Sequence, residues 1–578
     1  MSRRAQKTAM PQVAGWRLGV VALVFFLLVG ALMWRAVELQ VLDRQFLQTQ
    51  GEARQMRTRA MPAHRGVITD RHGEPLAISS PVDSVWADPG QLLDHPEAVT
   101  ALAELVGMPR ARLQRRLEAR PGSEFAWVRR QVSPEQAEAV RRAALPGVAL
   151  QQEYRRFYPS GEVSAHLLGF TNIDDQGQEG LELTYDAWLR GEPGRKRVIQ
   201  DRLGRVVEDV ELLREPRAGR DLALSIDRRL QYLAYRELKA AVREHDARGG
   251  SLVLLDVESG EVLAMVNQPG FNPHRRNEIG NGVQRNRAII DAYEPGSLIK
   301  PFTVLAALRE GVVRPETSLS TSPGTLRVGR HTIRDIRDYG EIDVTTLLQK
   351  SSNVGAVRLA LEMEPDALWG LLLEMGFGAS TFVGFQGEAT GRVSSMPPRD
   401  EVQRATLSFG YGLTATPLQI ARAYATLAAA GVQRPVSLLH RNGQPPESEE
   451  QVLDPALSRQ VLEMLETVTQ PGGTGTRAAV PGYRVAGKTG TVRKAGPTGY
   501  GEDDGYIAMF AGVAPVSRPR LAMAVLVDGP RGDEYYGGQV AAPVFGQVMA
   551  GALRLMNIAP DGDALPSGLI VAGGEGRP

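Results

Sequence analysis

Ser297 and Lys300 are the residues whose types and spacing first indicate chemistry in this chain. Gly296 precedes them and apolar residues follow at helical spacing, so Ser297 is predicted to lie at the start of a helix. Pro301 fits that position, because the first N–H groups of a helix have no intrahelical partner. Residues three apart share a helical face, so the Lys300 amine can reach the Ser297 oxygen. The simpler alternative is a helix-capping Ser with an incidental Lys.

Ser351 and Asn353 form a second polar pair, within the tripeptide Ser351-Ser352-Asn353. Helical patterns flank this tripeptide on both sides, at residues 344–350 and 354–362. Taken alone, it is most simply a capping turn between two helices.

The strand predicted over residues 483–493 carries a third candidate, Lys488-Thr489-Gly490-Thr491. A Gly within a strand often marks close approach of a ligand to the backbone, although a bulged strand with solvent-facing polar residues is the simpler interpretation. In the order S-x-x-K, S-x-N and K-T-G-T, the three segments are the motif set of penicillin-recognising serine acyltransferases. Two of the seven Lys in the chain occupy both Lys positions of that set.

The motif set indicates how a serine can be activated without histidine. No His lies near the three segments in the sequence, so a Ser-His-Asp triad is not available. Lys300 is the expected base, because burial and the neighbouring cation Lys488 would lower its pKa. Ser351 is expected to relay protons, and Asn353 to donate to and accept from a substrate amide.

Substrate contacts are predicted along the strand that carries Lys488. Thr489 and Lys488 are expected to hold the terminal carboxylate of a D-Ala-D-Ala stem peptide, with Gly490 allowing close approach. The backbone N–H groups of Ser297 and Thr491 are expected to form an oxyanion hole. The peptide would then join this strand as an additional strand.

A sheet and a group of helices must position these segments. The run Ser251–Val266 predicts a hairpin, and further strands are predicted at 483–493, 506–513 and 521–528. The final helix, Pro543–Met556, has apolar residues spaced for packing on a sheet. Strands at both ends with helices between them predict an α/β (α+β) domain whose inserted helical lobe borders a cleft.

The N-terminal run Leu18–Trp34 is uncharged and apolar, at the short end of what crosses a bilayer. Four basic residues precede it, Arg3, Arg4, Lys7 and Arg17. The positive-inside rule therefore predicts a single-pass anchor with a cytoplasmic N-terminus and an exported body. A cleavable signal peptide is the alternative, but the run continues into Arg35 without a small-x-small site.

Composition excludes several classes of protein. The chain has no Cys, which excludes thiol catalysis, Fe–S clusters and disulfides. Its 8 His are scattered, so neither a metal nor another cofactor is expected, and a net charge of +1 gives no footprint for nucleic acid. The texture of the 578 residues predicts five parts: a cytoplasmic tail (1–17), a transmembrane anchor (18–34), a mixed α/β segment (35–220), a catalytic domain (221–557) and a disordered tail (558–578).

The sequence resembles the class B penicillin-binding proteins, in particular their septal, cell-division branch and its pseudomonad-type members. Beyond the motifs, the resemblance rests on Arg65–Ala77, Arg155–Gly180, Asp201–Asp209, Asn286–Lys300 and Glu534–Phe545. Gln386 departs from the pattern, because Pro is usual there, in a loop outside the chemistry. The resemblance implies that residues 35–220 are a dimerisation or partner-docking pedestal. No glycosyltransferase-like region lies between anchor and pedestal, which disfavours the bifunctional class A type.

The resemblance implies a peptidoglycan D,D-transpeptidase, of the serine-type D-Ala-D-Ala carboxypeptidase class, that cross-links septal stem peptides and is acylated by β-lactams. It implies a five-stranded antiparallel sheet flanked by helices, and a periplasmic catalytic domain anchored in the bacterial inner membrane. A membrane-embedded glycan polymerase and other division-complex proteins are the implied partners. A paralogue for specialised conditions, a β-lactamase or D,D-carboxypeptidase-like hydrolase, a β-lactam sensor and a non-catalytic scaffold are the alternatives.

Lys300→Arg is predicted to abolish acylation by a β-lactam although it preserves the charge. Arginine cannot release its proton near neutral pH, and loss of general-base assistance costs about 10²- to 10⁴-fold in rate. Lys488→Arg is expected to be milder, because that position mainly supplies positive charge toward a carboxylate. The second-order acylation rate of each folded variant is the measurement. Near-wild-type acylation of Lys300→Arg would exclude Lys300 as the base.

Overall fold

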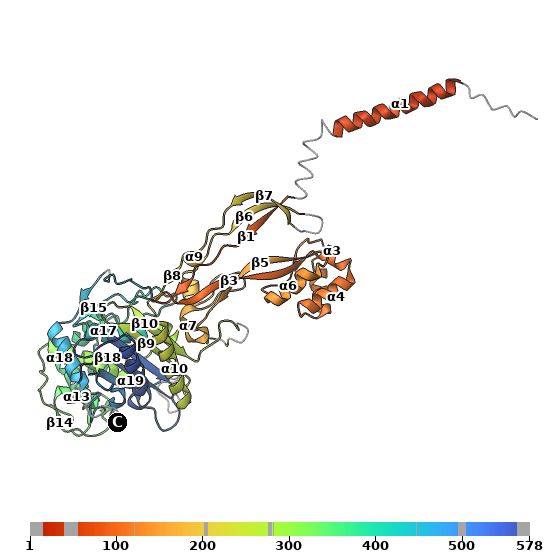
Figure 1. The fold of residues 1–578 in the computed structure, drawn as a ribbon. Helices are drawn as coiled ribbons and strands as arrows, with labels where there is room; N and C mark the ends of the chain where they lie inside the picture. Colours follow the sequence, from red (N-terminus) through yellow and green to blue (C-terminus); the bar gives the residue numbers. More distant parts are fainter. Residues whose placement is uncertain are drawn as a thin grey trace, which may run out of the picture. The chain divides into compact units, whose positions relative to one another are not determined.

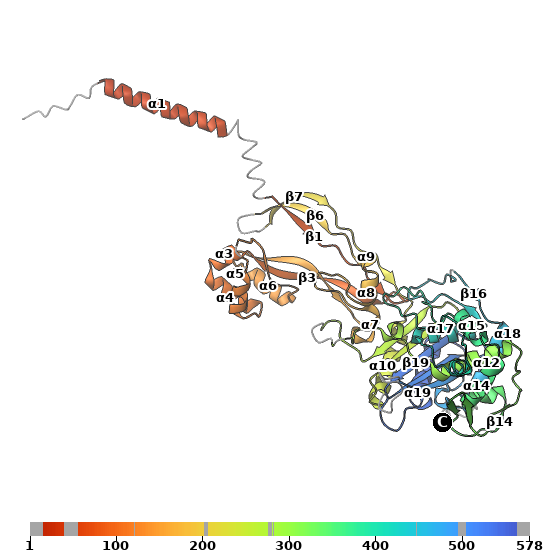
Figure 2. The same ribbon diagram turned by 180° about the vertical axis from the view of Figure 1, so that it is seen from behind.

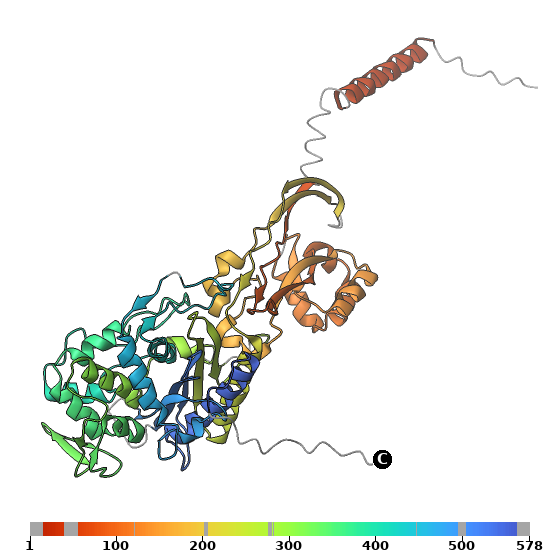
Figure 3. The same cartoon turned by 60° about the vertical axis from the view of Figure 1, so that its left-hand side comes forward.

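The computed structural model describes residues 15–39, 56–120, 122–200, 206–275, 280, 282–446, 448–494 and 505–562 (Figures 1, 2 and 3). The chain forms two compact units. The smaller unit comprises Met1–Ala63, Pro81–Glu153 and Glu192–Arg217, and the larger comprises His64–Ser80, Tyr154–Gly191 and Ala218–Pro578. The five-part division stays a prediction, and most of its two tails (1–17 and 558–578) lies outside the described residues, as does part of Asp201–Asp209.

Helix α1 (Gly15–Val37) contains the predicted membrane anchor. Its 23 residues, at about 1.5 Å each, span the roughly 30 Å hydrocarbon core of a bilayer. Its large apolar side chains, from Trp16 to Val37, are exposed. Of the helices in the described ranges, α1 is the one long and apolar enough to cross a membrane.

The smaller unit contains a three-stranded antiparallel sheet with the order β1-β6-β7. Its strands are β1 (Met56–Met61), β6 (Gly194–Gln200) and β7 (Val206–Arg214). Between β1 and β6 in the sequence, the smaller unit also contains α3 (Pro89–Leu93), α4 (Pro96–Leu105), α5 (Arg110–Glu118), β4 (Ala126–Arg129) and α6 (Pro134–Ala143). These helices and β4 share one apolar core.

The sequence pattern of Pro96–Glu118 predicts a single polar helix, but this prediction is wrong, because the structure has two separate helices there, α4 and α5. Gly107 between them has φ +62°, a conformation that favours glycine. Pro109 then has no N–H to continue the first helix and serves as the N-cap of the second.

Strands β3 (Pro75–Ala87) and β5 (Val148–Phe157) pair with each other, and each contributes residues to both units. Strand β3 pairs with β4 at one end and with β2 (Ile68–Thr69) at the other, and β2 pairs with β8 (Leu222–Ala223). The larger unit also includes the short helices α7 (Ala165–Leu168), α8 (Gly180–Thr184) and α9 (Asp186–Leu189) and the 3-10 turn η2 (Gly161–Val163).

The main sheet of the larger unit has the order β10-β9-β19-β18-β17, and every neighbouring pair is antiparallel. Its strands are β9 (Gly249–Asp256), β10 (Val262–Gln268), β17 (Ala486–Arg493), β18 (Tyr506–Ala514) and β19 (Leu521–Asp528). This confirms the five-stranded antiparallel sheet, including the hairpin of β9 and β10. Strand β17, which carries Lys488, forms one edge.

Helices cover both faces of this sheet. Leu252 and Leu254 share a core with α10 (Arg228–Glu244) and α19 (Gly537–Leu555), whereas Val253 and Leu255 share the core of the helical lobe. This alternation follows from the two-residue period of a strand. The final helix begins at Gly537, earlier than predicted, so Pro543 lies inside it. The buried apolar face of α19 outweighs the backbone hydrogen bond that Pro543 cannot donate.

The inserted helical lobe lies between β10 and β17 in the sequence and is coloured green to blue in Figure 3. Its main helices are α12 (Lys300–Arg309), α13 (Val344–Lys350), α14 (Asn353–Glu362), α15 (Ala367–Glu374), α16 (Glu401–Ser408), α17 (Pro417–Ala428) and α18 (Pro455–Glu466). Shorter elements are α11 (Arg287–Ile290), η4 (Gly296–Ile299), β11 (Leu319–Ser320), β12 (Thr325–Val328), β13 (His331–Arg334), β14 (Glu341–Ile342), β15 (Val432–Gln433), β16 (Glu450–Gln451) and η5 (Thr476–Ala478).

Arg65, Arg156 and Glu182 form a buried ionic network within the larger unit. Glu182 Oε2 accepts from Arg65 Nε at 2.8 Å, and Oε1 accepts from Arg156 Nε at 2.6 Å. Arg65 also donates to Asp186 Oδ1 at 2.8 Å. A single carboxylate therefore joins two chain segments that lie far apart in the sequence.

Glu182→Ala is expected to lower the free energy of unfolding by about 3–5 kcal/mol, because two buried guanidinium groups lose their shared carboxylate. Thermal unfolding of the purified chain is the measurement. Glu138→Ala is the matched control, since Glu138 pairs with Arg141 and Arg142 on the surface, and it should cost less than about 1 kcal/mol. Equal melting temperatures for the two variants would contradict a structural role for the network.

Candidate active site

Ser297 lies in the 3-10 turn η4, directly before α12. Gly296 in this turn has φ +55°, and a Cβ at that position would lie 2.4 Å from Val492 Cγ2 on β17. The turn therefore approaches the edge strand more closely than a residue with a side chain allows. Ser297 is partly exposed between buried neighbours, so it is the residue of this turn that a substrate can reach.

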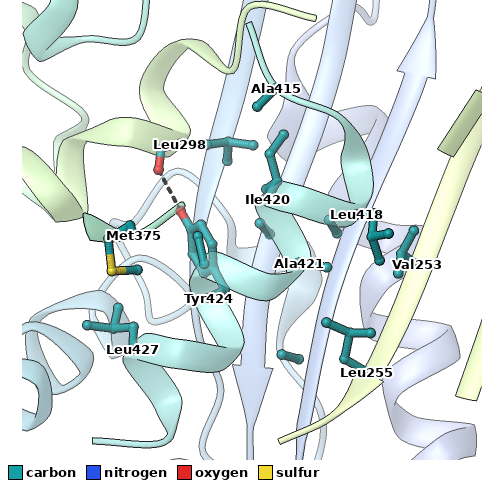
Figure 4. Close-up of a cluster of buried hydrophobic side chains, with 14 of the residues drawn as sticks. Val253, Leu255, Leu298, Met375, Ala415, Leu418, Ile420, Ala421, Tyr424 and Leu427 are labelled. Carbon is teal, nitrogen blue, oxygen red and sulfur yellow. Dashed lines mark hydrogen bonds between the residues drawn. The ribbon is translucent and has the colours of Figure 1, made fainter. Parts of the chain in front are cut away.

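A buried tyrosine supports the same turn. Tyr424, on α17, donates its hydroxyl proton to Leu298 O at 3.0 Å (Figure 4). Burial raises the pKa of Tyr424 well above its usual value, so the hydroxyl stays a donor. The sequence analysis missed Tyr424, because no spacing relates it to Ser297.

Lys300 contacts the second predicted segment. Its Nζ donates to Ser351 O at 2.6 Å and to Asn353 Oδ1 at 2.7 Å, and lies 3.2 Å from Ser351 Oγ. The fold thus brings the S-x-x-K and S-x-N segments together. In the part of the chain that the structure describes, no hydrogen bond joins Lys300 to Ser297.

In the Ser351–Asn353 turn, one residue caps a helix and the other two contact Lys300. Ser351 ends α13 in the left-handed conformation, with φ +60°. Ser352 caps α14 by accepting from Gly355 N at 2.9 Å. The capping role expected as the simpler alternative therefore belongs to Ser352, while Ser351 and Asn353 are the residues that bind Lys300.

The third segment lies on β17 beside the Ser297 turn. A Cβ at Gly490 would lie 3.1 Å from Leu298 Cγ, so a side chain there would press against this turn. Thr491 Oγ1 accepts from Gly537 N at 2.9 Å, which joins β17 to the start of α19. Because β17 is an edge strand, one row of its backbone N–H and C=O groups faces away from β18.

Lys488 and Thr489 belong to the same strand. Lys488 is completely buried, and its Nζ donates to Thr489 O at 3.1 Å. Thr489 Oγ1 lies 2.8 Å from Thr474 Oγ1 in a hydroxyl–hydroxyl hydrogen bond. The hydrogen bonds of Lys488 and Thr489 therefore stay on β17 and on Thr474 beside it. The amine of Lys300, by contrast, binds the second motif segment.

The two buried amines have lowered pKa values. Burial lowers the pKa of Lys300 to about 7, against the attraction of the Asp335 carboxylate. Burial and the charge on Lys300 hold the pKa of Lys488 well below its usual value. Together the two lysines bind fewer protons at neutral pH than two exposed lysines would.

Asp335 is a second residue that the sequence analysis missed. It accepts hydrogen bonds from the Ser352 hydroxyl and from the Asn353 and Val354 N–H groups. No recognisable spacing in the sequence links it to the motifs. Within the described ranges, no group of three or more His, Cys, Asp or Glu side chains could hold a metal ion.

Two protein-family models match the chain in succession. Residues 60–224 match the penicillin-binding protein dimerisation domain, and residues 250–550 match the penicillin-binding protein transpeptidase domain. The second match contains all three motif segments.

Curated relatives match almost over their full lengths. The chain is 45% identical over 570 residues to the peptidoglycan D,D-transpeptidase FtsI of Escherichia coli, covering 97% of this chain and 96% of the relative. It is 41% identical over 550 residues to the probable peptidoglycan D,D-transpeptidase PbpC of Pseudomonas aeruginosa, covering 95% and 97%.

Solved structures agree with these matches. The transpeptidase domain of Burkholderia pseudomallei penicillin-binding protein 3 has a TM-score of 0.54 at 40% identity, over 58% of this chain and 97% of its own. Penicillin-binding protein 3 of Mycobacterium tuberculosis, complexed with aztreonam, has a TM-score of 0.67 at 26% identity, over 87% and 98%. The two domain models and the near full-length relatives establish that the chain belongs to the class B penicillin-binding proteins.

Proposed function

We propose that this chain is a peptidoglycan D,D-transpeptidase that cross-links stem peptides in septal wall synthesis through an acyl-enzyme on Ser297. The observation that carries the proposal is the buried Lys300 amine, bonded to Ser351 and Asn353 beside the partly exposed Ser297. The names of the full-length relatives support the reaction and the division role.

Acylation begins at the Ser297 hydroxyl. Its oxygen attacks the carbonyl carbon of the penultimate D-Ala, and its proton passes to neutral Lys300. The developing oxyanion accepts from the N–H groups of Ser297 and Thr491. When the peptide C–N bond breaks, the leaving D-Ala amine takes up a proton through Ser351. An ester on Ser297 and free D-Ala are the products.

Deacylation transfers the peptide to an acceptor. The amine of a second stem peptide attacks the ester carbonyl, gives up a proton and restores the Ser297 hydroxyl. Water in place of that amine would give the D,D-carboxypeptidase reaction. We therefore propose that the same site belongs to the serine-type D-Ala-D-Ala carboxypeptidase class. Asn353 orients the substrate amide, and Lys488 and Thr489 hold its terminal carboxylate.

Peptide binding follows from the position of β17 at the sheet edge. An extended peptide can pair with its free N–H and C=O groups as a sixth strand. Gly490 lets the Ser297 turn approach this strand closely. β-Lactams would enter the same position and acylate Ser297.

Helix α1 supports attachment to the bacterial inner membrane. Basic residues before the span, at Arg3, Arg4, Lys7 and Arg17, favour a cytoplasmic N-terminus and a periplasmic catalytic domain. A membrane-embedded glycan polymerase and other division-complex proteins are then the partners in reach of the chain, with no nucleic acid involved.

The full chain, purified in detergent, is expected to form one stable adduct with benzylpenicillin. The transpeptidase relatives favour slow deacylation, because a transpeptidase site favours an acceptor amine over water, whereas a β-lactamase with the same motifs releases its adduct rapidly. Intact-mass analysis should give one adduct, and peptide mapping should assign it to Ser297. An adduct elsewhere, or release within seconds, would replace this proposal with a hydrolase or another acyl-enzyme.

The acylation rate is expected to rise with pH and to level off above about 7, since the neutral form of Lys300 accepts the proton and its pKa lies at about 7. The second-order rate with benzylpenicillin between pH 5.5 and 9 gives the profile. Lys239→Gln, on α10, is the control and should reproduce it. A flat profile would remove Lys300 from the base role.

A further inference from the structure

Asp335 follows β13 and binds the second motif from outside the three motif segments. Its Oδ2 accepts from the Ser352 hydroxyl, and its Oδ1 accepts from the N–H groups of Asn353 and, at 3.1 Å, Val354. The first N–H groups of a helix have no intrahelical partner, so this carboxylate caps α14. Its negative charge also suits the positive end of the helix.

Arg334, the residue before it, fixes the direction of the Asn353 amide. Arg334 O accepts from Asn353 Nδ2 at 2.9 Å. A carbonyl oxygen only accepts and a charged amine only donates, so this contact turns Asn353 Oδ1 toward Lys300 Nζ, 2.7 Å away. Arg334 and Asp335 thus hold both the side chain and the backbone of Asn353.

Asp335 is the charged group that acts on the pKa of Lys300 within the described residues. Burial lowers this pKa, and the Asp335 carboxylate opposes the effect. The sequence predicts that Lys488, on β17, lowers the pKa of Lys300, but instead the charge on Lys300 lowers the pKa of Lys488. On the helices packed against α12, Lys350 donates to Gly472 O, Glu374 pairs with Arg309, and Glu466 pairs with Arg484. The remaining charged residues of these helices do not contribute to the pKa shift of Lys300; they are Arg358 and Glu362 on α14 and Arg459 and Glu463 on α18.

We propose that Asp335 is a positioning residue for acylation: by holding Ser352 and the backbone of Asn353, it keeps the turn that binds Lys300 in place and puts a negative charge near the buried amine. The inference rests on the proposed function, because it needs Lys300 as the base and Ser297 as the nucleophile. It adds a group that touches neither the substrate nor the reacting atoms. Asp335 acts through the turn that it caps and through its field at the buried amine.

The test compares pH profiles of benzylpenicillin acylation for the full chain and for Asp335→Asn. The substitution keeps one accepting oxygen and removes the charge. Without that charge the amine loses its proton more readily, so the midpoint should fall by about one pH unit. The plateau rate should fall by about tenfold or more, because the turn holds Lys300 less accurately.

Two further variants separate charge from folding. Asp335→Ser keeps a helix-capping hydroxyl without the charge, and it should show the same acid shift if Asp335→Asn does not fold. Asp335→Glu keeps the charge, so its midpoint should stay while its plateau falls. Asp338→Asn is the matched control: Asp338 is exposed in the same loop, accepts from Gly340 N at 2.9 Å, and should leave the profile unchanged.

The outcomes distinguish the two proposals. An acid shift in the uncharged variants, absent from Asp335→Glu and Asp338→Asn, supports the positioning role. A fallen plateau with an unmoved midpoint in folded Asp335→Asn or Asp335→Ser would overturn it in favour of a simple helix cap. If the wild-type chain forms no adduct at Ser297, the proposed function itself fails. If the adduct forms normally and the uncharged variants match wild type, only the role of Asp335 fails.

Discussion

The Lys300 amine is fully buried at the start of α12, where water cannot solvate a positive charge. Protein groups must therefore replace its hydration shell, and they come from one turn: Ser351 O, Ser351 Oγ and Asn353 Oδ1. The same burial brings its pKa to about 7. A lysine on the surface would be almost entirely protonated at neutral pH, so the packing around α12 creates the reactivity proposed for this site.

The rest of the larger unit fixes the positions of that turn, the Ser297 turn and β17 relative to one another. Strand β17 pairs with β18, the other three strands extend the same antiparallel sheet, and helices cover both faces of it. Backbone approaches are close: a Cβ at Gly410 would lie 2.0 Å from Gly296 O, and one at Gly296 would meet Val492. Small residues at these positions let separate elements touch, so the positions of the three motifs are fixed by packing.

Sequence patterns predicted the helices and strands well, but they did not predict the contacts between residues that lie far apart in the sequence. The two apolar runs joined by a turn signal at β9 and β10 and the helical spacing around Ser351 are local signals, and the structure has a hairpin and two helices at those positions. The break at Gly107 was missed because apolar spacing continues across it. Asp335, Tyr424 and the Arg65–Glu182 pair could not be predicted from spacing, because each joins residues that only the folded chain brings together.

The strand order of the main sheet has a consequence during synthesis of the chain. Strand β9 lies inside the sheet, yet its neighbour β19 begins at Leu521, more than 250 residues after β9 ends at Asp256. At ribosomal rates of about 5–20 residues per second, β9 waits roughly 12–50 s for that partner. Meanwhile one backbone edge of β9 and the apolar residues on the face that packs on the helical lobe stay uncovered, which invites pairing with other chains. A chain with this strand order depends on a holding factor or on delayed folding until its last strands arrive.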